Sequence, residues 1–309
     1  MRVVFLGTPD FALPSLRALI LTHEVVAVVC QPDREKDRKG NFVFGAVKKE
    51  AIAQGIPVYQ FEKIRRDGVE TLKNLKPDIM ITCAYGQILS QEILDIAPYG
   101  VLNVHGSILP KYRGSAPIQR SLIEGEQKTG VTIMKTDVGM DSGDILAIEE
   151  YEIKQDDYVD DLYAVLSEIG AKLLIPTIEG YVSGKIVPRK QDESLVTHAP
   201  MIKKNDYLID FTRPNTEIRN YIRGCGFGIC DLNGVQLKVY KADLVAGREG
   251  KNAGEIVRAK KREFIVACGE GALNLTELQL SGKKRMSTID FLNGVKLTGE
   301  EKLTEIKSN

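Results

Sequence analysis

The sequence contains no tryptophan, only three histidines and only five cysteines among its 309 residues. Three separated histidines exclude a His-rich metal cluster, and no two cysteines have the C-x-x-C spacing of a zinc or redox site. An odd number of cysteines without such spacing is typical of reduced, mostly buried thiols in a cytosolic protein. We therefore expect no bound metal and a cytoplasmic location. The residues concerned are His23, His105, His198, Cys30, Cys83, Cys225, Cys230 and Cys268.

Long apolar runs are also missing. No segment approaches the roughly 20 apolar residues that a transmembrane helix needs. The first residues lead directly into a strand pattern, and they show neither the apolar core of a signal peptide nor an Arg-rich presequence. We therefore expect no membrane partner.

The charge is balanced overall but not along the chain. Lys and Arg number 42, as do Asp and Glu, yet residues 201–309 hold 19 basic and 14 acidic side chains, against 23 and 28 in residues 1–200. A basic C-terminal part is expected if that part touches a polyanion. It is equally compatible with a solvated surface, and the count alone does not decide between the two.

The chain has 309 residues, which is longer than most domains built around a single hydrophobic core, so we expect two domains. A content of 43% hydrophobic and 27% charged residues is typical of a soluble globular protein. A polar stretch at 189–206 predicts a linker. The domains would then cover residues 1–188 and 207–309.

The N-terminal part begins with a strand, a glycine turn, a helix and a second strand, which is a Rossmann-like order. Residues 3–6 and 24–30 are the predicted strands, and Pro14 suits the first turn of the helix between them. The G-x-G-x-x-G fingerprint is absent, so we predict an α/β doubly wound parallel sheet that binds no dinucleotide. Further strands are expected at 56–59, 78–83, 130–135 and 144–151 and around Asn103, and helices at 46–54, 69–75, 116–122 and 159–182.

From Tyr207 the pattern changes to short strands separated by turn signals. A helix at 215–223 precedes strands at 235–244, 254–258, 264–267 and 272–280, and Asn233–Gly234 is a hairpin signal. Several short strands in so short a segment indicate a small OB-like β-barrel domain.

Chemically useful side chains gather in Val101–Gly114, where an apolar run carries Asn103 and His105 two residues apart. In an extended strand this spacing points both side chains to one face. The glycines and proline that follow predict a loop at the strand end, where α/β proteins place their sites. Asp141 lies between glycines that could let backbone approach a ligand closely. His105 alone could be a structural core residue; the combination with Asn103 and Asp141 favours catalysis.

These residues follow a composite pattern. Asn103 begins Asn-x-His-x-Ser-aliphatic-Leu-Pro-x-aromatic-Arg-Gly, and 36 residues after His105 comes Asp141 in a Met-Asp-x-Gly element. The composite resembles the folate-dependent formyltransferases. The segment Leu280–Ser287 is similar to the C-terminal signature of the methionyl-tRNA formyltransferases, so the resemblance extends over nearly the full chain.

The resemblance implies transfer of a formyl group between two amines through a tetrahedral intermediate. Asn103 can donate its side-chain N–H groups to the oxyanion of that intermediate. His105 is suited to move a proton near neutral pH as acid, base or both, or to donate to the oxyanion as an imidazolium. Asp141 would favour and orient the charged imidazole, directly or through water. Neither a covalent nucleophile nor a metal is needed.

The resemblance also implies 10-formyltetrahydrofolate as the formyl donor. In the family, a Tyr-Gly-x-Ile-Leu loop lines the pterin pocket, and this chain has that pattern at Tyr85–Leu89. The alternative is a strand-to-helix turn in which Gly86 serves only the backbone. The expected folate contacts are Gln87, Ile88, Leu89, Ser107, Ile108, Leu109 and Pro110.

Two basic segments are candidate nucleic-acid contacts. Gln31 to Gly45 is a charged loop predicted to overhang the ligand crevice, and Arg34, Arg38 and Lys39 would contact phosphate. In the methionyl-tRNA formyltransferases, a loop with a similar Gln-Pro-Asp-Arg start reaches toward the tRNA acceptor end. In the C-terminal signature, Lys283, Lys284 and Arg285 would hold the tRNA backbone. For both segments the alternative is a solvated charged surface.

The function implied by the resemblance is formylation, for translation initiation, of the α-amino group of methionine on initiator methionyl-tRNA. One alternative is a formyltransferase for an amino sugar or glycinamide ribonucleotide, against which the basic barrel argues. Another is a non-catalytic tRNA- or nucleotide-binding module. The sequence departs from the family at 43–47, where relatives have Pro-(Ser/Thr)-Pro-Val, and at 225–228, where relatives have a Pro- and Trp-containing element.

Overall fold

The computed structural model describes residues 1–34, 42–298 and 300–306. Its backbone divides into two compact units. Unit 2 takes two short segments that precede residue 162, which the sequence did not indicate. Unit 1 comprises Met1–Pro117, Lys128–Ile153 and Leu162–Pro200, and unit 2 comprises Ile118–Gln127, Lys154–Asp161 and Met201–Asn309.

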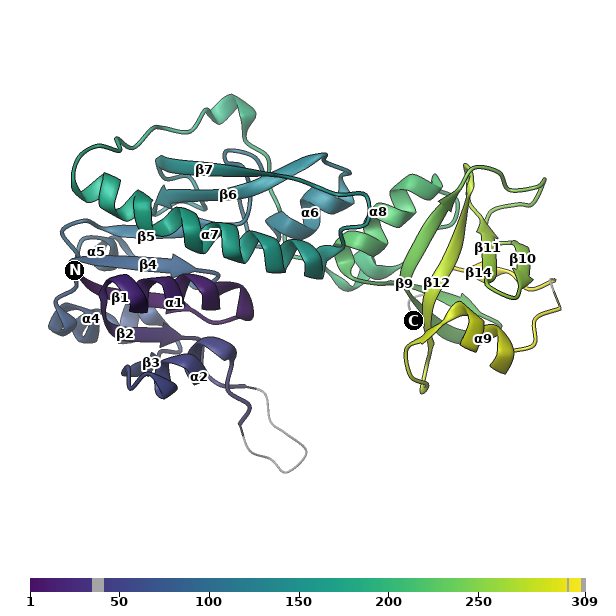
Figure 1. Ribbon diagram of the computed structural model, residues 1–309, viewed down its shortest axis with the longest axis horizontal. Helices are drawn as coiled ribbons and strands as arrows, with labels where there is room; N and C mark the ends of the chain where they lie inside the picture. The colour runs from purple at the N-terminus through teal and green to yellow at the C-terminus, as the bar shows by residue number, and fades with distance from the viewer. Residues whose placement is uncertain (35–41, 299, 307–309) are drawn as a thin grey trace. The chain divides into compact units, whose positions relative to one another are not determined.

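Unit 1 is built on a seven-stranded sheet with the order β3-β2-β1-β4-β5-β6-β7 (Figure 1). Strands β1 to β5 run parallel, which confirms the expected Rossmann-like sheet. Strands β6 and β7 form an antiparallel hairpin at one edge, because only a short loop joins them. The strands are β1 (Arg2–Gly7), β2 (Glu24–Cys30), β3 (Val58–Gln60), β4 (Ile79–Cys83), β5 (Val101–His105), β6 (Lys128–Lys135) and β7 (Ile145–Glu152).

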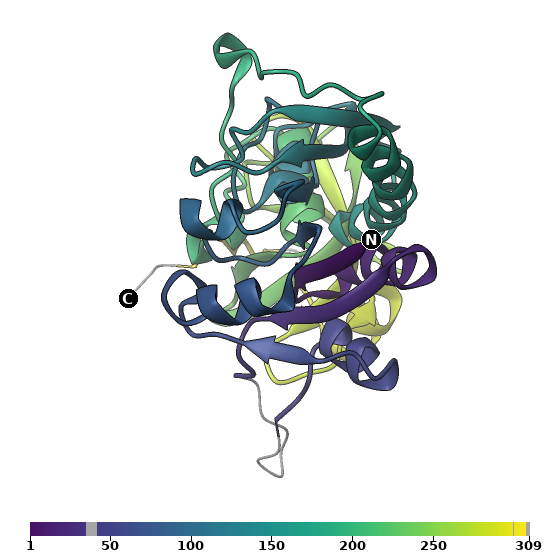
Figure 2. The same ribbon diagram turned by 90° about the vertical axis from the view of Figure 1, so that its left-hand side faces the viewer.

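Helices cover both faces of this sheet, α1 and α7 on one face and α4 and α5 on the other (Figures 1 and 2). Gly170 lets α7 lie close against β5, since a Cβ there would come within 2.8 Å of Val104 Cγ1. The strand that carries Asn103 is thereby held between α7 and its neighbouring strands. The helices of unit 1 are α1 (Leu13–Thr22), α2 (Ala46–Ala53), α3 (Ile64–Asp67), α4 (Val69–Leu75), α5 (Gln91–Leu94) and most of α7 (Val159–Val182). Helix α6 (Pro117–Ile123) belongs almost entirely to unit 2.

The core of unit 1 lies on both faces of the sheet. Because successive strand residues point to opposite faces, Val4 and Leu6 of β1 pack with Leu72 of α4 and Ile93 of α5. Strands buried on two faces have continuous apolar sequences, which is why the central strands could be predicted without alternation.

Unit 2 contains a curled antiparallel sheet with the order β10-β11-β12-β9-β8-β14, and β13 pairs with β12. A bridge between Glu255 and Lys302 links the two ends of the sheet, and the expected small barrel is confirmed in this form. Asn233 and Gly234, with φ of 55° and 79°, make the predicted hairpin turn between β8 and β9. The elements are α8 (Asn215–Cys225), β8 (Gly228–Leu232), β9 (Val235–Val245), β10 (Ile256–Lys260), β11 (Glu263–Ala267), β12 (Ala272–Leu280), β13 (Met286–Ser287), α9 (Thr288–Gly294) and β14 (Leu303–Thr304).

Residues 189–200, expected to form part of a linker, are packed into unit 1. Arg189 makes an isolated bridge with Ile145 of β7, and His198 makes one with Arg113. A short 3-10 helix at Glu193–Leu195 lies between these contacts. The polar composition of this segment therefore reflects hydrogen bonding to unit 1, and unit 2 resumes at Met201.

Candidate active site

Asn103 lies on β5 opposite Thr82 of β4. The Thr82 hydroxyl donates to Asn103 Oδ1 over 2.9 Å. Because Oδ1 accepts this bond, the N–H groups of the amide point the other way, and Asn103 Nδ2 lies 3.5 Å from Asp141 Oδ1. The amide is thus oriented to present donors to the site. Thr82 could not be predicted as a site residue, because nothing in the sequence aligned the two strands.

His105 is buried, with 5% of its surface exposed. Its Nε2 lies 3.0 Å from the Tyr112 carbonyl oxygen. A carbonyl only accepts, so Nε2 carries a hydrogen, and the nitrogen that can gain or lose a proton is Nδ1. Nδ1 lies 3.7 Å from Asp141 Oδ2. The ring is therefore fixed in one orientation, with Nδ1 toward the carboxylate.

Asp141 has a left-handed backbone, with a φ of 50°. Its Oδ2 accepts a 2.8 Å hydrogen bond from the Gly114 backbone N–H. The flanking glycines serve the loop rather than a close approach to a ligand. A Cβ on Gly143 would meet the Lys135 carbonyl oxygen at 1.7 Å, and one on Gly139 would meet Ser142 Oγ at 2.0 Å. The structure thus brings Asp141 to Asn103 and His105, although it lies far from them in the chain.

The loop after β5 carries four of the expected folate contacts. Ser107 and Leu109 are buried, and the Ser107 hydroxyl donates to the Lys111 carbonyl. Thr132 of β6 fixes this backbone, because its hydroxyl donates to the Ser107 carbonyl over 2.6 Å and accepts from Leu109 N–H over 3.1 Å. Ile108 and Pro110 are partly exposed, so their side chains are the ones a ligand can reach.

The loop after β4 carries the other three expected folate contacts, Gln87, Ile88 and Leu89. Ile88 is 71% exposed, whereas Leu89 is buried in the core. The Gln87 amide bonds within the protein: its Oε1 accepts from Ile64 N–H, and its Nε2 donates to the Phe61 carbonyl and to Gln31 Oε1. Gln87 therefore shapes this loop, and a side-chain contact from it to folate stays a prediction.

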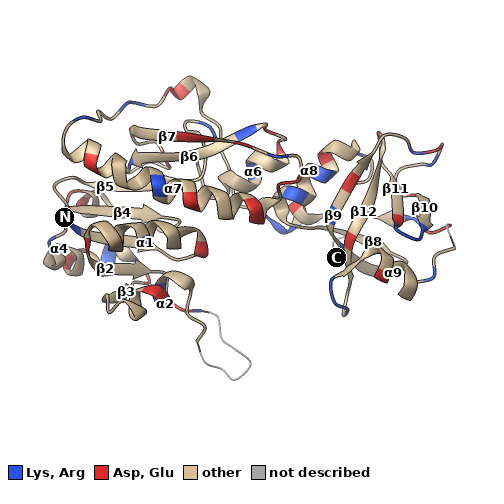
Figure 3. Ribbon diagram, viewed as in Figure 1, with Lys and Arg blue, Asp and Glu red and all other residues tan. Residues whose placement is uncertain are grey.

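The expected nucleic-acid contacts lie in different settings. Arg34 is exposed and pairs with Glu62 over 3.1 Å, and Arg38 and Lys39 lie outside the described residues. Lys283 and Lys284 are exposed in the turn after β12. Figure 3 shows basic residues at this turn and at the turn after β10.

Unit 2 also carries a row of aromatic rings and cations, here called the aromatic–cation row, that includes Arg285. The Tyr207 and Phe227 rings stack at 4.7 Å, and the Phe227 and Tyr240 rings are 5.7 Å apart. Lys238 lies over Phe227 at 4.6 Å, and Arg285 lies over Tyr240 at 4.1 Å. The row consists of Tyr207, Phe227, Lys238, Tyr240 and Arg285. All are at least partly exposed, and sequence analysis missed the row because its members come from four separate segments.

Arg285 also makes a bidentate ion pair with Glu277, in which Nε lies 2.5 Å from Oε1 and Nη2 lies 2.8 Å from Oε2. The hydrogen bond from Arg285 lowers the pKa of Glu277 below its usual value. The charge of Arg285 is thus partly neutralised. Lys283 and Lys284 have no ion pair within the described part of the chain.

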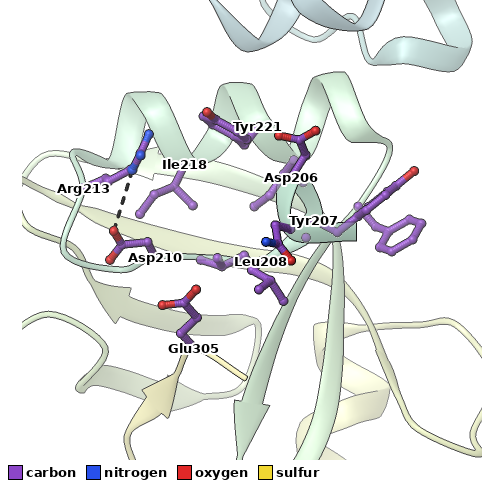
Figure 4. Close-up of a pocket in the computed structure, with 13 residues that line it drawn as sticks. Asp206, Tyr207, Leu208, Asp210, Arg213, Ile218, Tyr221 and Glu305 are labelled. Carbon is purple, nitrogen blue, oxygen red and sulfur yellow. Dashed lines mark ion pairs between the residues drawn. The ribbon is translucent and has the colours of Figure 1, made fainter. Parts of the chain in front are cut away.

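A hollow of about 260 Å³ opens in unit 2 (Figure 4). Asp206, Asp210 and Glu305 line it, and Arg213 is paired with Asp210. Asp206 and Asp210 are each paired with an arginine, Arg120 and Arg213 respectively. None of the residues predicted from the sequence lines this hollow, but Tyr207 and Phe227 of the aromatic–cation row do.

All five cysteines are free, and four are buried. Burial raises the pKa of the Cys30, Cys83 and Cys268 thiols to about 12 each. These thiols stay protonated and unreactive near neutral pH. Across the described ranges, the His, Cys, Asp and Glu side chains form no group of three that could hold a metal ion. No helix among those residues has the length and apolar character to cross a membrane.

Both units of the chain match known protein families. The Formyl transferase family model matches residues 1–178, and the model of the Formyl transferase C-terminal domain matches residues 201–296. The methionyl-tRNA formyltransferase of Bacillus subtilis is 46% identical over 299 residues, covering 95% of this chain and 94% of the relative. The chain belongs to the methionyl-tRNA formyltransferase family. It is an enzyme that transfers a formyl group.

A second relative agrees with this assignment, and a solved structure shares the fold. The methionyl-tRNA formyltransferase of Solibacter usitatus is 44% identical and covers 99% of both chains. Among solved structures, the sugar 3N-formyl transferase WlaRD has a TM-score of 0.68 at 20% identity, covering 92% of this chain and 99% of that one. At this identity the likeness shows a shared fold alone.

Proposed function

We propose that this enzyme moves a formyl group from 10-formyltetrahydrofolate to the methionine α-amino group of initiator methionyl-tRNA, in the cytoplasm. The observation that carries the proposal is the convergence of Asn103 Nδ2 and His105 Nδ1 on Asp141. The choice of acceptor rests on relatives of 44–46% identity that bear the name methionyl-tRNA formyltransferase and match across both units. The free thiols are those expected of a cytosolic protein.

Asn103 would stabilise the oxyanion. As the acceptor nitrogen bonds to the formyl carbon, negative charge develops on the formyl oxygen. Thr82 already holds the amide with its N–H groups outward, so no reorganisation is needed when the charge appears. Donors fixed in advance are the most effective form of electrostatic catalysis.

His105 and Asp141 would handle the proton. The new bond leaves one proton too many on the acceptor nitrogen, and the bond from the formyl carbon to the folate nitrogen breaks only if that nitrogen is protonated. His105 Nδ1 can take the first proton and deliver it to the second site, so the reaction balances without another reagent. Asp141, at 3.7 Å, favours the charged imidazole between the two transfers.

The folate contacts extend this proposal. Ile88, Ile108 and Pro110 offer side-chain surface, and the backbone of Ser107 to Leu109, fixed by Thr132, offers a rigid wall. Leu89 would support the loop from the core. The two loops follow β4 and β5, so they lie at the carboxyl edge of the sheet, where α/β proteins bind ligands.

The tRNA contacts belong to unit 2 in this proposal. Lys283 and Lys284 would neutralise backbone phosphates. The aromatic–cation row adds a second means of contact, since partly exposed aromatic rings can stack on unpaired bases. Phe227 comes from the segment at 225–228 that departs from the family pattern, so it supplies aromatic surface where this chain has no tryptophan.

A panel of acceptors tests the proposed function. With 10-formyltetrahydrofolate as donor, we expect formylation of charged initiator tRNA and only background with free methionine, a nucleotide amino sugar or glycinamide ribonucleotide. A preference for either of the last two would assign the enzyme to another branch of its family. Binding of the tRNA without any formyl transfer would support the non-catalytic alternative.

A further inference from the structure

Residues 189–199, here called the strap, connect to both sides of the candidate active site. The strap was expected to be linker, and its contacts with unit 1 run between residues far apart in the chain. One arm reaches the loop that carries Asp141, and the other reaches the loop that holds His105.

The first arm is Gln191, which is 8% exposed. Its Nε2 donates to the carbonyl oxygens of Asp141 and Gly143, at 2.8 Å each. Its Oε1 accepts from Arg113 Nε over 3.0 Å. Arg113 is itself buried and pairs with Glu193 of the strap over 2.7 Å. One amide thus ties the Asp141 loop to the loop that follows β5.

The second arm is Thr197. Its hydroxyl accepts from Tyr112 N–H over 2.9 Å, and its carbonyl accepts from Arg113 N–H over 2.9 Å. Tyr112 is the residue whose carbonyl receives the hydrogen bond from His105 Nε2. Thr197 therefore fixes the group that sets the orientation of the imidazole.

Two residues that the strap contacts, Asp141 and Tyr112, have strained backbone conformations. Asp141 and Tyr112 are non-glycine residues with left-handed backbones, at φ of 50° and 62°. Such conformations persist only where surrounding contacts determine them, and they cluster at functional sites. The strap supplies a hydrogen bond to the backbone of each.

We propose that the strap positions the catalytic side chains, with Gln191 holding Asp141 and Thr197 holding His105 through Tyr112. This inference rests on the proposed function for its activity readout. Neither Gln191 nor Thr197 reacts; both act through other residues. A displacement of about 1 Å at a reacting group can cost about a hundredfold in rate, so loss of the strap contacts should appear in kcat.

Gln191→Met tests the first arm because it keeps the side-chain length and removes the amide. We expect kcat to fall about 10- to 100-fold, with KM for charged tRNA and for folate changed less than about twofold. Gln191→Glu keeps the acceptor for Arg113 and removes the donors, so it should lose at least as much. Asn215→Leu is the matched control. Asn215 also donates from one amide nitrogen to two carbonyls, of Val245 and Ala272, but in unit 2, and its loss should leave kcat unchanged.

Thr197 tests the second arm with a conservative pair. Thr197→Val removes the hydroxyl at constant shape, and we expect kcat to fall about 3- to 10-fold because Tyr112 loses an acceptor. Thr197→Ser keeps the hydroxyl and should restore the wild-type value. Equal kcat for the Val and Ser variants would remove Thr197 from the inference.

A readout without substrate separates this inference from the proposed function. The Gly114 amide donates to Asp141 Oδ2, so in Gln191→Met its hydrogen exchange, followed by NMR, should accelerate at least tenfold. Suppose that the Gly114 amide exchanges faster in Gln191→Met although the wild-type enzyme formylates no charged tRNA. That result would support the positioning role of the strap and reject the proposed function. If Gln191→Met formylates charged tRNA with an unchanged kcat and the Gly114 amide exchanges at its wild-type rate, the inference that the strap positions the catalytic residues is wrong.

Discussion

The two regions to which we assign function are built in opposite ways. In unit 1, His105 is almost fully buried, and Asn103, His105 and Asp141 each bond to partners that fix their orientation. In unit 2, Lys283 and Lys284 are exposed, and the aromatic–cation row is open to solvent in part. The first arrangement suits chemistry, which requires geometry set in advance. The second suits a large charged partner, which requires many replaceable contacts.

This difference predicts which kinetic property changes when residues of each region are substituted. A fixed donor aimed at a developing charge is worth about 3–4 kcal/mol of the activation barrier. An exposed cation at a phosphate acts mainly through counterion release, so its contribution falls with salt. Substitutions in unit 1 should therefore change turnover, and substitutions in unit 2 should change affinity and its salt dependence.

The largest effect is expected for Asn103→Ala. Loss of the oxyanion donors should lower kcat about 10²–10³-fold with little change in KM, measured by steady-state formylation. Asn74→Ala, an exposed asparagine on α4 whose amide bonds to Glu70, is the control and should behave as wild type. A kcat within a factor of a few in Asn103→Ala would remove the oxyanion role.

Asp141→Asn should have the next largest effect, lowering kcat about 10- to 100-fold. The carboxylate lies 3.7 Å from His105 Nδ1 and accepts from the Gly114 N–H, so it would orient the imidazole and hold its loop. Steady-state formylation measures the loss. A kcat within a factor of a few of wild type in Asp141→Asn would limit Asp141 to shaping its loop.

A smaller effect is expected when Lys283, Lys284 and Arg285 are all changed to Gln. KM for charged tRNA should rise about 3- to 10-fold, folate affinity should stay the same, and the salt dependence of tRNA binding should weaken. Most of the change should come from the two lysines, since Arg285 is paired with Glu277.

The turn after β10 offers a matched control, because Lys260, Lys261 and Arg262 are also exposed. The same triple change there removes the same charge from another turn of unit 2. Equal losses from both triple variants would indicate only a general charge effect. No change in tRNA affinity or salt slope from the first triple variant would exclude a tRNA role for its turn, and Arg34 with Arg38 and Lys39 would become the main candidates.

The smallest effect is expected for Arg285→Gln on stability. The pair with Glu277 is partly exposed, so its loss should cost under about 1 kcal/mol in the free energy of unfolding. Because the folded pKa of Glu277 is lowered, the pair stabilises the fold above the unfolded pKa of the carboxyl. That stabilisation is lost as pH falls through the lowered value. Denaturant unfolding should therefore show a smaller difference between wild type and variant at pH 3 than at pH 7.

Local pattern predicted much of this fold. The helix Val159–Val182 was predicted with its observed bounds because its apolar residues recur at helical spacing. The turn at Asn233–Gly234 was predicted because few other residue pairs adopt two left-handed conformations. Asn103 and His105 share a face because strand geometry requires it, and both reach Asp141.

What could not be predicted depends on contacts between distant segments. Asp141 and Gln191 are 50 positions apart in the chain, and no local sequence pattern indicates the hydrogen bond between them. The strap is polar and has no period, so it resembled a linker, although its polar groups bond to unit 1. The orientation of the Asn103 amide likewise required the alignment of β4 with β5 that brings Thr82 opposite to it.

The separation of chemistry from tRNA binding is tested most directly by single-turnover formylation. With donor saturating and enzyme in excess over charged initiator tRNA, a titration in enzyme gives the rate constant at saturation and the concentration for half-saturation. We predict that Asn103→Ala lowers only the first and that the Lys283, Lys284 and Arg285 triple variant raises only the second. A reduced rate constant at saturation in the triple variant would contradict this division between the two regions. So would an Asn103→Ala enzyme whose main change is a higher concentration for half-saturation.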